Sequence, residues 1–348
     1  MSGLYRALRP LLFRLDPELA HRLAITVGKS GWLPGGRALA DPALRVSVLG
    51  LDFPNPVGLA AGFDKNAEAA DAMLAQGFGF VEVGSLTPLP QPGNPAPRLF
   101  RLTEDRAIIN RLGFNNQGYE QARRRLERRG GKGGIVGVNI GAGRDAADPV
   151  ADYVAGIKAL NEVADYLTVN ISSPNTAGLR SLQARPRLEE LIDRLSEARA
   201  KLKKTQPFLI KIAPDLDDGA LEDISVVALR GGIDGIVVSN TTVFRPSLKS
   251  ANAGESGGLS GRPLFELSTR KLARLFALTS GKLPLIGVGG IDSAETAFEK
   301  FRAGASLVQL YSGMVYKGPG IARDLSRALS HRLRRQGVDH VSRLTGSG

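Results

Sequence analysis

Short apolar runs recur along most of the chain, and each one ends in polar or glycine residues. There are eight, at residues 56–65, 78–88, 134–143, 166–175, 208–214, 235–242, 283–290 and 306–313. Between most of them the apolar residues follow a helical period, as in Leu188–Lys204 and Phe265–Ser280. Continuous apolar runs that alternate with amphipathic helices predict buried parallel strands. Eight such units in one chain favour a closed (β/α)8 TIM barrel.

An open, doubly wound sheet is the alternative α/β architecture for the same pattern. Its dinucleotide-binding form carries the spacing GxGxxG and an acidic residue about 20 positions later. The glycine-rich segments GVGG (287–290) and GGLSG (257–261) lack that spacing. The barrel is therefore the preferred prediction.

The first residues follow a different pattern from the rest of the chain. Residues 3–15 place leucines on one helical face with arginines largely between them, which predicts an amphipathic helix. Asp16 and Pro17 then predict the N-cap and first residue of a second helix. This pair could cap the main domain or lie on a bilayer surface. We divide the chain into a helical module (1–36), a barrel (37–336) and a tail (337–348) that is expected to be disordered.

The longest interruption of the strand–helix rhythm covers residues 89–133. It is rich in Pro, Gly and Asn but also contains specific aromatic and arginine residues. Long loops in compact domains are usually functional or disordered. The aromatic and arginine content favours an ordered loop over the mouth of the barrel.

Composition removes several classes of chemistry. The 348 residues include no cysteine and three histidines, so disulfides, thiolate nucleophiles and iron–sulfur clusters are excluded and no metal site is expected.

The formal charge of +12 suggests a polyanion partner. However, the arginine-rich runs at 123–132 and 331–337 lack interleaved aromatics for base stacking, so nucleic acid is not expected. No apolar run reaches the roughly 18 residues of a membrane span, and no signal peptide is recognisable.

Polar side chains gather at the predicted carboxyl ends of the strands. In a barrel these ends converge on one face, where active sites lie. Asparagine is the most frequent type among them, and an amide both donates and accepts hydrogen bonds. This pattern is typical of a wall around a planar heterocycle with C=O and N–H groups. The residues are Asp64, Lys65, Glu82, Ser85, Asn139, Asn170, Ser172, Ser173, Asn175, Lys211, Ser239, Asn240, Thr241, Gly289, Gly290, Tyr311 and Ser312.

The ends of the last two predicted strands indicate a phosphate site. They carry the sequences GVGG and YSG, which place backbone N–H groups at helix N-termini. In barrels a phosphate often binds after strands seven and eight. A phosphate beside a heterocycle predicts flavin mononucleotide (FMN) or a sugar-phosphate substrate.

Lys211 lies inside an apolar run and has three interpretations. It could pair with a buried acid, form a Schiff base as in an aldolase, or face the N1/O2 edge of a flavin and stabilise negative charge there. The residues alone leave all three open. An aldolase-like barrel lyase and a non-enzymatic basic binding module therefore remain as alternative functions.

Eight longer segments of the chain are distinctive when they are taken together and in order. They are AAGFDKN (60–66), PQPGNPAPRLFRL (90–102), INRLGFNN (109–116), NISSPNTAGLR (170–180), VSNTT (238–242), GGLSGRPL (257–264), GVGGI (287–291) and LVQLYSG (307–313). These segments closely resemble class 2 dihydroorotate dehydrogenases, the membrane-associated, quinone-linked enzymes of pyrimidine synthesis. The resemblance covers roughly residues 1–330.

The resemblance implies a reaction and the residues that perform it. Dihydroorotate would lose a proton from C5 to the base Ser173 and a hydride from C6 to N5 of FMN. The resemblance assigns the pyrimidine and its carboxylate to Lys65, Asn110, Arg111, Leu112, Gly113, Phe114, Asn170, Asn175, Asn240 and Thr241. It assigns FMN to Ala61, Gly62, Phe63, Asp64, Lys65, Ser85, Asn139, Asn170, Lys211 and Ser239, with the phosphate on Gly261, Gly290, Tyr311 and Ser312.

The resemblance also implies where the electrons go. The N-terminal helices correspond to the family's quinone tunnel and membrane foot, and His21 and Arg101 match positions near the quinone. Peripheral contact with the cytoplasmic face of the cell membrane and a monomeric state are expected on the same basis.

Overall fold

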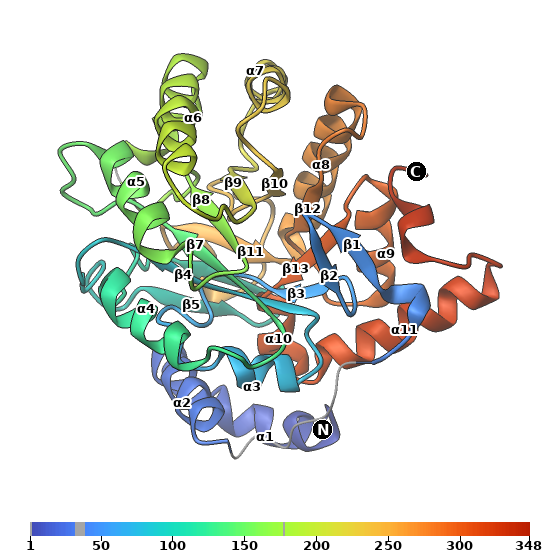
Figure 1. Cartoon of the computed structure of the whole chain (residues 1–348). Coiled ribbons are helices and arrows are strands. Elements are labelled where there is room, and N and C mark those ends of the chain that lie inside the picture. Colours follow the sequence, from blue (N-terminus) through green and yellow to red (C-terminus); the bar gives the residue numbers. More distant parts are fainter. Residues whose placement is uncertain (1, 32–38, 177) are drawn as a thin grey trace.

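Eight parallel strands close into a barrel at the centre of the molecule (Figure 1). The computed structural model describes residues 2–31, 39–176 and 178–348. Each strand pairs with the next along the chain, and the last pairs back with the first, which confirms the predicted closed barrel. The barrel strands are β3 (Val57–Leu59), β4 (Phe80–Leu86), β7 (Ile135–Ile140), β8 (Tyr166–Asn170), β9 (Phe208–Ile212), β10 (Gly235–Val238), β12 (Leu285–Val288) and β13 (Leu307–Leu310).

Helices form an outer layer around this barrel, one after each strand. The predicted helix at 188–204 is α6, which begins three residues earlier, and the one at 265–280 matches α8 closely. A short extra helix, α10 (Ser312–Lys317), separates β13 from the last helix of the layer. The layer consists of α3 (Ala70–Ala75), α4 (Gly118–Arg128), α5 (Pro149–Leu160), α6 (Arg185–Ala200), α7 (Asp218–Leu229), α8 (Phe265–Thr279), α9 (Ala294–Arg302) and α11 (Ile321–Arg335).

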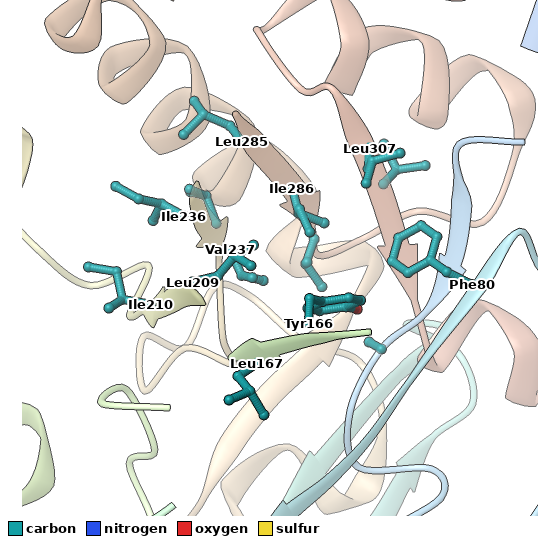
Figure 2. Packing of buried hydrophobic residues seen from close by; sticks show 14 of the residues in the cluster. Phe80, Tyr166, Leu167, Leu209, Ile210, Ile236, Val237, Leu285, Ile286 and Leu307 are labelled. Atoms are coloured by element: carbon teal, nitrogen blue, oxygen red, sulfur yellow. The ribbon is translucent and has the colours of Figure 1, made fainter. Parts of the chain in front are cut away.

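Aromatic rings fill the interior of the barrel (Figure 2). The rings of Phe80 and Tyr166 are fully buried, with centroids 6.3 Å apart. Glycines on neighbouring strands make room for them, because a Cβ at Gly137 would lie 2.0 Å from Cζ of Tyr166 and one at Gly58 would lie 2.3 Å from Cζ of Phe80. The barrel is thus a packed core rather than a pore, and ligands must bind above it.

Short elements close the amino-terminal end of the barrel. A 3-10 turn, η1 (Pro42–Leu44), leads into the hairpin of β1 (Val46–Val48) and β2 (Leu51–Phe53). The ring of Phe53 packs edge-on against Phe80, with centroids 5.1 Å apart. The hairpin therefore shields the barrel core from solvent at this end.

A second, three-stranded sheet covers the opposite end. In it β5 (Leu99–Leu102) and β6 (Ala107–Asn110) form a hairpin, and β6 also pairs with β11 (Gly258–Gly261). The insertion at 89–133 supplies two of these strands, so the predicted ordered loop is confirmed as a hairpin. Further 3-10 turns border the same end of the barrel: η2 (Leu179–Gln183), η3 (Ala251–Gly254) and η4 (Arg262–Leu264).

The N-terminal helices α1 (Ser2–Leu12) and α2 (Pro17–Lys29) pack against the barrel by specific contacts. The Asp16 side chain accepts from the backbone N–H groups of Glu18 and Leu19, which confirms the predicted N-cap. The hydroxyl of Tyr5 donates to the carbonyl of Val315 at 2.6 Å, and Arg98 donates to both carboxylate oxygens of Glu18. The helix predicted to reach residue 15 ends at Leu12. The boundary of the module at residue 36 lies outside the described residues.

The C-terminal segment is not the disordered tail that the sequence suggested. It forms a 3-10 turn, η5 (Val341–Leu344), and both Val341 and Leu344 are buried in the main core. Two apolar residues three positions apart lie on the same side of such a turn, so even this short segment can anchor itself. The prediction for residues 337–348 is therefore wrong.

Neither a membrane span nor a metal centre is found in the part of the chain that the structure describes. No helix there is both long and apolar enough to cross a bilayer. Likewise, no group of three or more His, Cys, Asp or Glu side chains in these residues could hold a metal ion.

Candidate active site

A cavity lies between the carboxyl ends of the barrel strands and the three-stranded sheet. It encloses about 1250 Å³, including its open mouth. Most of the residues singled out from the sequence line it: Ala61, Gly62, Lys65, Ser85, Asn110, Leu112, Gly113, Phe114, Asn170, Ser173, Asn175, Lys211, Ser239, Asn240, Thr241, Gly261, Gly290, Tyr311 and Ser312.

Other predicted residues lie behind this lining. Phe63 is buried against the rings of His21 and Tyr311. The Asp64 carboxylate accepts from the backbone N–H groups of Glu68 and Ala69 at 2.8 Å, so it stabilises the loop after β3. The side chain of Asn139 is fully buried.

Two arginines predicted to act near the cavity are engaged at its edge. The Arg111 guanidinium pairs with Glu255 at 2.7 Å and lies over the ring of Phe100, and Arg111 does not itself line the cavity. Arg101 donates to the carbonyls of Phe13 and Leu15 and lies 4.8 Å from the centre of the Phe13 ring. The structure thus connects Arg101 to the segment between α1 and α2.

Asparagine side chains at successive strand ends are hydrogen-bonded to one another. Asn170, the last residue of β8, donates to Ser85 Oγ at 3.0 Å and to Asn139 Oδ1 at 3.3 Å. Its own Oδ1 accepts from Asn240 at 3.2 Å. Asn175 donates to the carbonyl of Asn110 at 3.1 Å across the cavity. The polar wall inferred from separate segments therefore consists of one network around Asn170 and a separate contact between Asn175 and Asn110.

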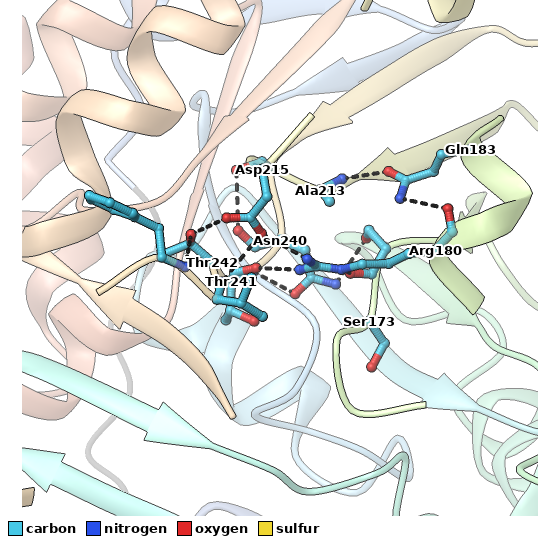
Figure 3. A network of polar contacts seen from close by, with 12 residues as sticks. Ser173, Arg180, Gln183, Ala213, Asp215, Asn240, Thr241 and Thr242 are labelled. Carbon is cyan, nitrogen blue, oxygen red and sulfur yellow. Dashed lines mark hydrogen bonds and ion pairs between the residues drawn. The ribbon is translucent and has the colours of Figure 1, made fainter. Parts of the chain in front are cut away.

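Ser173 lies in the loop that follows β8 and faces the cavity (Figure 3). It is 5% exposed, and its Oγ accepts from the backbone N–H of Asn175 at 3.3 Å. No carboxylate or imidazole hydrogen-bonds to Ser173 within the described residues.

Arg180 joins two of the loops that form the cavity (Figure 3). Its guanidinium donates to the carbonyl of Ser172 at 3.1 Å and to that of Thr241 at 3.1 Å, and pairs with Asp215 at 2.8 Å. Gln183 connects this cluster to β9, since it accepts from the N–H of Ala213 and donates to the carbonyl of Arg180. Sequence reasoning assigned no role to Arg180, although it ends the stretch NISSPNTAGLR.

Lys65 connects the cavity to the N-terminal module. Its Nζ lies 3.3 Å from Nε2 of His21, and the other ring nitrogen of His21 lies 3.1 Å from the hydroxyl of Tyr311. Burial lowers the pKa of Lys65 to about 8. Burial, together with the charges of Lys65 and Arg22, lowers the pKa of His21 well below its usual range. His21 is thus a neutral acceptor for the Lys65 ammonium.

Lys211 is a buried lysine on β9 that lines the cavity. It is 5% exposed, and its ammonium group has no hydrogen-bond or ion-pair partner among the described residues. Burial lowers the pKa of Lys211, and the charge of Glu82 opposes that shift. A buried, unpaired ammonium group is a donor ready for an electron-rich ligand.

Glycines shape the cavity near the start of α9. Gly290 has a φ of +76°, and a Cβ there would lie 2.4 Å from Cβ of Phe265. Gly261 has a φ of +91°, and a Cβ there would lie 2.4 Å from the carbonyl oxygen of Arg106. Only glycine fits at these two positions. Nearby, the hydroxyls of Ser260 and Ser312 lie 2.8 Å apart, and the Asp292 carboxylate pairs with Arg262 at 3.2 Å.

The fold and cavity define a (β/α)8-barrel protein with a deep polar site at the carboxyl ends of its strands. The profile of the family described as Dihydroorotate dehydrogenase matches residues 43–333. This chain belongs to that family.

Relatives and solved structures agree with this assignment. "Dihydroorotate dehydrogenase (quinone)" of Brucella melitensis biotype 2 is 57% identical over 352 residues, covering 99% of this chain and 96% of the relative, and the protein of the same name from Brucella ovis gives the same values. The crystal structure of DHODH in complex with ferulenol from Eimeria tenella has a TM-score of 0.92 and 42% identity, covering 95% of each chain. The ligand-free type from Eimeria tenella also has a TM-score of 0.92, with 43% identity, covering 95% of this chain and 99% of that one.

Proposed function

We propose that this protein oxidises (S)-dihydroorotate to orotate, using FMN as cofactor and a membrane quinone as electron acceptor, in the biosynthesis of pyrimidine nucleotides. The observation that carries the proposal is the polar wall itself: asparagine, serine and lysine side chains from five strand ends converge on one cavity in a chain of the dihydroorotate dehydrogenase family. A wall of amides suits a ring bearing C=O and N–H groups, and ammonium groups suit its carboxylate.

The cavity supports the binding of FMN on three grounds. Gly261 and Gly290 line the cavity at positions where a Cβ would collide with Arg106 or Phe265, and backbone N–H groups of such a glycine-rich lining would suit a phosphate. The unpaired ammonium of Lys211 suits the electron-rich edge of an isoalloxazine ring. The hydroxyls of Ser85 and Ser239 at the ends of β4 and β10 supply further donors. When bound, FMN supplies a two-electron acceptor for the hydride from C6 of dihydroorotate.

The substrate would occupy the part of the cavity nearer the β5–β6 hairpin. Asn110, Asn175 and Asn240 offer amides to the pyrimidine ring. The protonated form of Lys65 offers a charge to its carboxylate, because carboxylate–ammonium hydrogen bonds are stronger than neutral ones. The nearby loop 112–114 would exclude water from the ring.

Ser173 would remove the proton from C5. A serine is a weak base, so its own proton must leave as the C–H bond breaks. The backbone N–H of Asn175 holds Ser173 Oγ from one side, which orients the remaining lone pairs. The C5 proton and the C6 hydride together account for the two hydrogens that dihydroorotate loses.

The N-terminal module would receive the quinone and contact the membrane from the cytoplasmic side. Large apolar side chains of α1 and α2 stay exposed, among them Leu8, Leu11 and Leu23, with Leu11 at 59%. Exposed leucines beside arginines suit the interface of an anionic bilayer. His21 and Arg101 lie where α2 and the α1–α2 connection meet the barrel, and would border the quinone path. We propose a monomer in peripheral contact with lipid.

Anaerobic mixing of purified protein with dihydroorotate tests the proposal, with absorbance near the flavin band as readout. Bleaching that recovers on adding a short-chain quinone, but not NAD or fumarate, would support both half-reactions. A yellow protein that does not bleach would contradict the substrate. A colourless protein that cannot be reconstituted with FMN would contradict the cofactor and favour a lyase acting through Lys211.

A further inference from the structure

The side chains of Asn139, Asn170 and Asn240 form a continuous hydrogen-bonded series, here called the asparagine chain. Each amide has an oxygen that only accepts and a nitrogen that only donates. Either orientation of an isolated amide is possible, so a connected series needs one member with a fixed role to set the direction of all the others. A carboxylate can play that role, because in its ionised form it only accepts.

Glu82 lies at one end of the asparagine chain, and both of its oxygens face donors. It belongs to β4 and is fully buried behind the cavity lining. Its Oε1 accepts from Nδ2 of Asn139 at 2.8 Å. Its Oε2 accepts from three further donors: Tyr166 at 3.1 Å, Thr168 at 3.2 Å and Gln309 at 2.8 Å. All four partners donate, and no cation pairs with Glu82 within the described residues.

The direction set at Glu82 continues through the series. Because Nδ2 of Asn139 points to Glu82, its Oδ1 faces the hydroxyl of Ser85 and Nδ2 of Asn170. Because Nδ2 of Asn170 points to Ser85, its Oδ1 accepts from the hydroxyl of Ser172 at 2.9 Å and from Nδ2 of Asn240 at 3.2 Å. Oδ1 of Asn240 then accepts from the N–H of Thr241 at 2.8 Å.

We propose that Glu82 is a positioning residue that fixes the donor–acceptor direction of the asparagine chain and thereby the affinity of the cavity for the pyrimidine ring. The inference rests on the proposed function, since it takes orotate as the ligand of this wall. Asn170, Asn240 and Ser85 line the cavity, whereas Glu82 and Asn139 act through them. A reversed amide at Asn170 would turn an N–H toward the Nδ2 of Asn240, which also donates, and would so displace the amide that Asn240 offers to the cavity.

Four variants separate this role from others. Glu82→Gln replaces the group that only accepts by one that also donates. Asn139→Ala keeps the charge of Glu82 but breaks its connection to Asn170. Tyr166→Phe is the matched control, because it removes a hydrogen bond to the same carboxylate without touching the asparagine chain. Glu82→Gln combined with Asn139→Asp moves the group that only accepts to residue 139, the next member of the asparagine chain. There it can still accept from Ser85 and Asn170.

The measurement is the dissociation constant of orotate for FMN-loaded protein, from the change in flavin absorbance on titration, with FMN content and thermal unfolding recorded for each variant. We expect Glu82→Gln and Asn139→Ala to weaken orotate binding about 10-fold or more, the effect of losing or reversing a buried hydrogen bond. Tyr166→Phe should lower the unfolding temperature but leave orotate affinity within about 2-fold, since it changes no ligand contact. The double variant should recover most of the lost affinity.

Several outcomes would overturn the inference. Unchanged orotate affinity in Asn139→Ala would contradict it, as would a Tyr166→Phe variant that weakens orotate binding as much as Glu82→Gln. If Glu82→Gln does not fold, Asn139→Ala decides alone. A wild-type protein that holds no FMN or does not bind orotate would instead contradict the proposed function, so the two failures are distinguishable.

Discussion

The Nζ atom of Lys65, in the loop after the first barrel strand, lies 3.3 Å from Nε2 of His21 on the N-terminal helix α2. This hydrogen bond joins the cavity to the module that precedes the barrel, as does the contact of His21 with Tyr311. Lys65 must donate, so Nε2 of His21 accepts and Nδ1–H of His21 donates to the hydroxyl of Tyr311. The protonation state of Lys65 therefore influences both the cavity and the contact of the barrel with helix α2.

The affinity for orotate should fall as pH rises through about 8. Burial lowers the pKa of Lys65 to about 8, and only the protonated form can pair with a carboxylate. Affinity should be constant below that value and decline above it by up to about 10-fold per pH unit. Titration of FMN-loaded protein with orotate from pH 6 to 10 measures this. Lys65→Gln should bind weakly at all pH values, and a decline that persists in this variant would assign the titration to another group.

Ser173→Ala should abolish most of the flavin reduction by dihydroorotate while leaving the protein folded and yellow. General-base catalysis contributes about 10² to 10⁴ in rate, so a loss in that range is expected in single-turnover mixing. The small change in volume should leave FMN content unaltered. Ser172→Ala is a useful comparison, because Ser172 is fully buried and bonded to Asn170 rather than facing the cavity. Undiminished reduction in Ser173→Ala would remove this residue from the chemistry.

Gly290→Ala should reduce the FMN content of the purified protein. The added Cβ would lie 2.4 Å from Cβ of Phe265, so the backbone that lines the cavity there must shift. Gly131→Ala is the matched control, because Gly131 has a similar φ of +80° but nothing within 4 Å of an added Cβ. Both variants carry the strain of a positive φ, about 1 kcal/mol, but only Gly290→Ala should lose flavin. Equal flavin content in the two would place the phosphate elsewhere.

Arg180→Met should weaken orotate binding by disconnecting the loops after β8 and β10. The guanidinium donates to the carbonyls of Ser172 and Thr241, and hydrogen bonds from charged groups contribute about 1.5 to 3 kcal/mol each. We expect at least a 10-fold rise in the dissociation constant. Arg194→Met should have almost no effect, because Arg194 pairs with Asp148 on the exposed surface. Comparable losses of orotate affinity in the Arg180→Met and Arg194→Met variants would point to a general effect of charge removal.

Glu18→Gln should loosen α2 from the barrel. Glu18 and Arg98 form a two-point pair whose side chains are only 19% and 13% exposed, so the variant should cost about 1 to 3 kcal/mol of local stability. Hydrogen–deuterium exchange in α2 should accelerate accordingly, whereas Lys29→Gln, at a mostly exposed pair on the same helix, should change it little.

The same pair predicts a pH dependence at the acidic end. Hydrogen bonding to Arg98 lowers the pKa of Glu18 below its usual 4.5. The contribution of ionised Glu18 to stability is therefore complete above its pKa in the unfolded chain. It is lost as the pH falls through the lower pKa that Glu18 has in the folded protein. Exchange in α2 of the wild-type protein should accelerate below about pH 4.5, and Glu18→Gln should show no such step.

The barrel could be predicted because buried parallel strands carry continuous apolar runs, which differ visibly from the helices between them. The strand-end position of Ser173, Lys211 and Asn240 then indicated the cavity. Arg180 was missed because its partners Asp215 and Thr241 lie 35 and 61 residues away, and no local pattern pairs them. The burial of Asn139 behind the cavity lining could not be predicted, since both faces of β7 are buried and the sequence offers no alternation to separate them.

The contact between Tyr5 and Val315 joins residues that are 310 positions apart. At a synthesis rate of about 5 to 20 residues per second, helix α1 emerges from the ribosome roughly 15 to 60 s before the segment it packs against. During that interval α1 lacks its partner α10, and the first barrel strand has β4 on one edge but lacks β13 on the other. The nascent chain thus presents an amphipathic helix to its surroundings for most of its synthesis, and a nearby bilayer can engage that helix before the barrel closes.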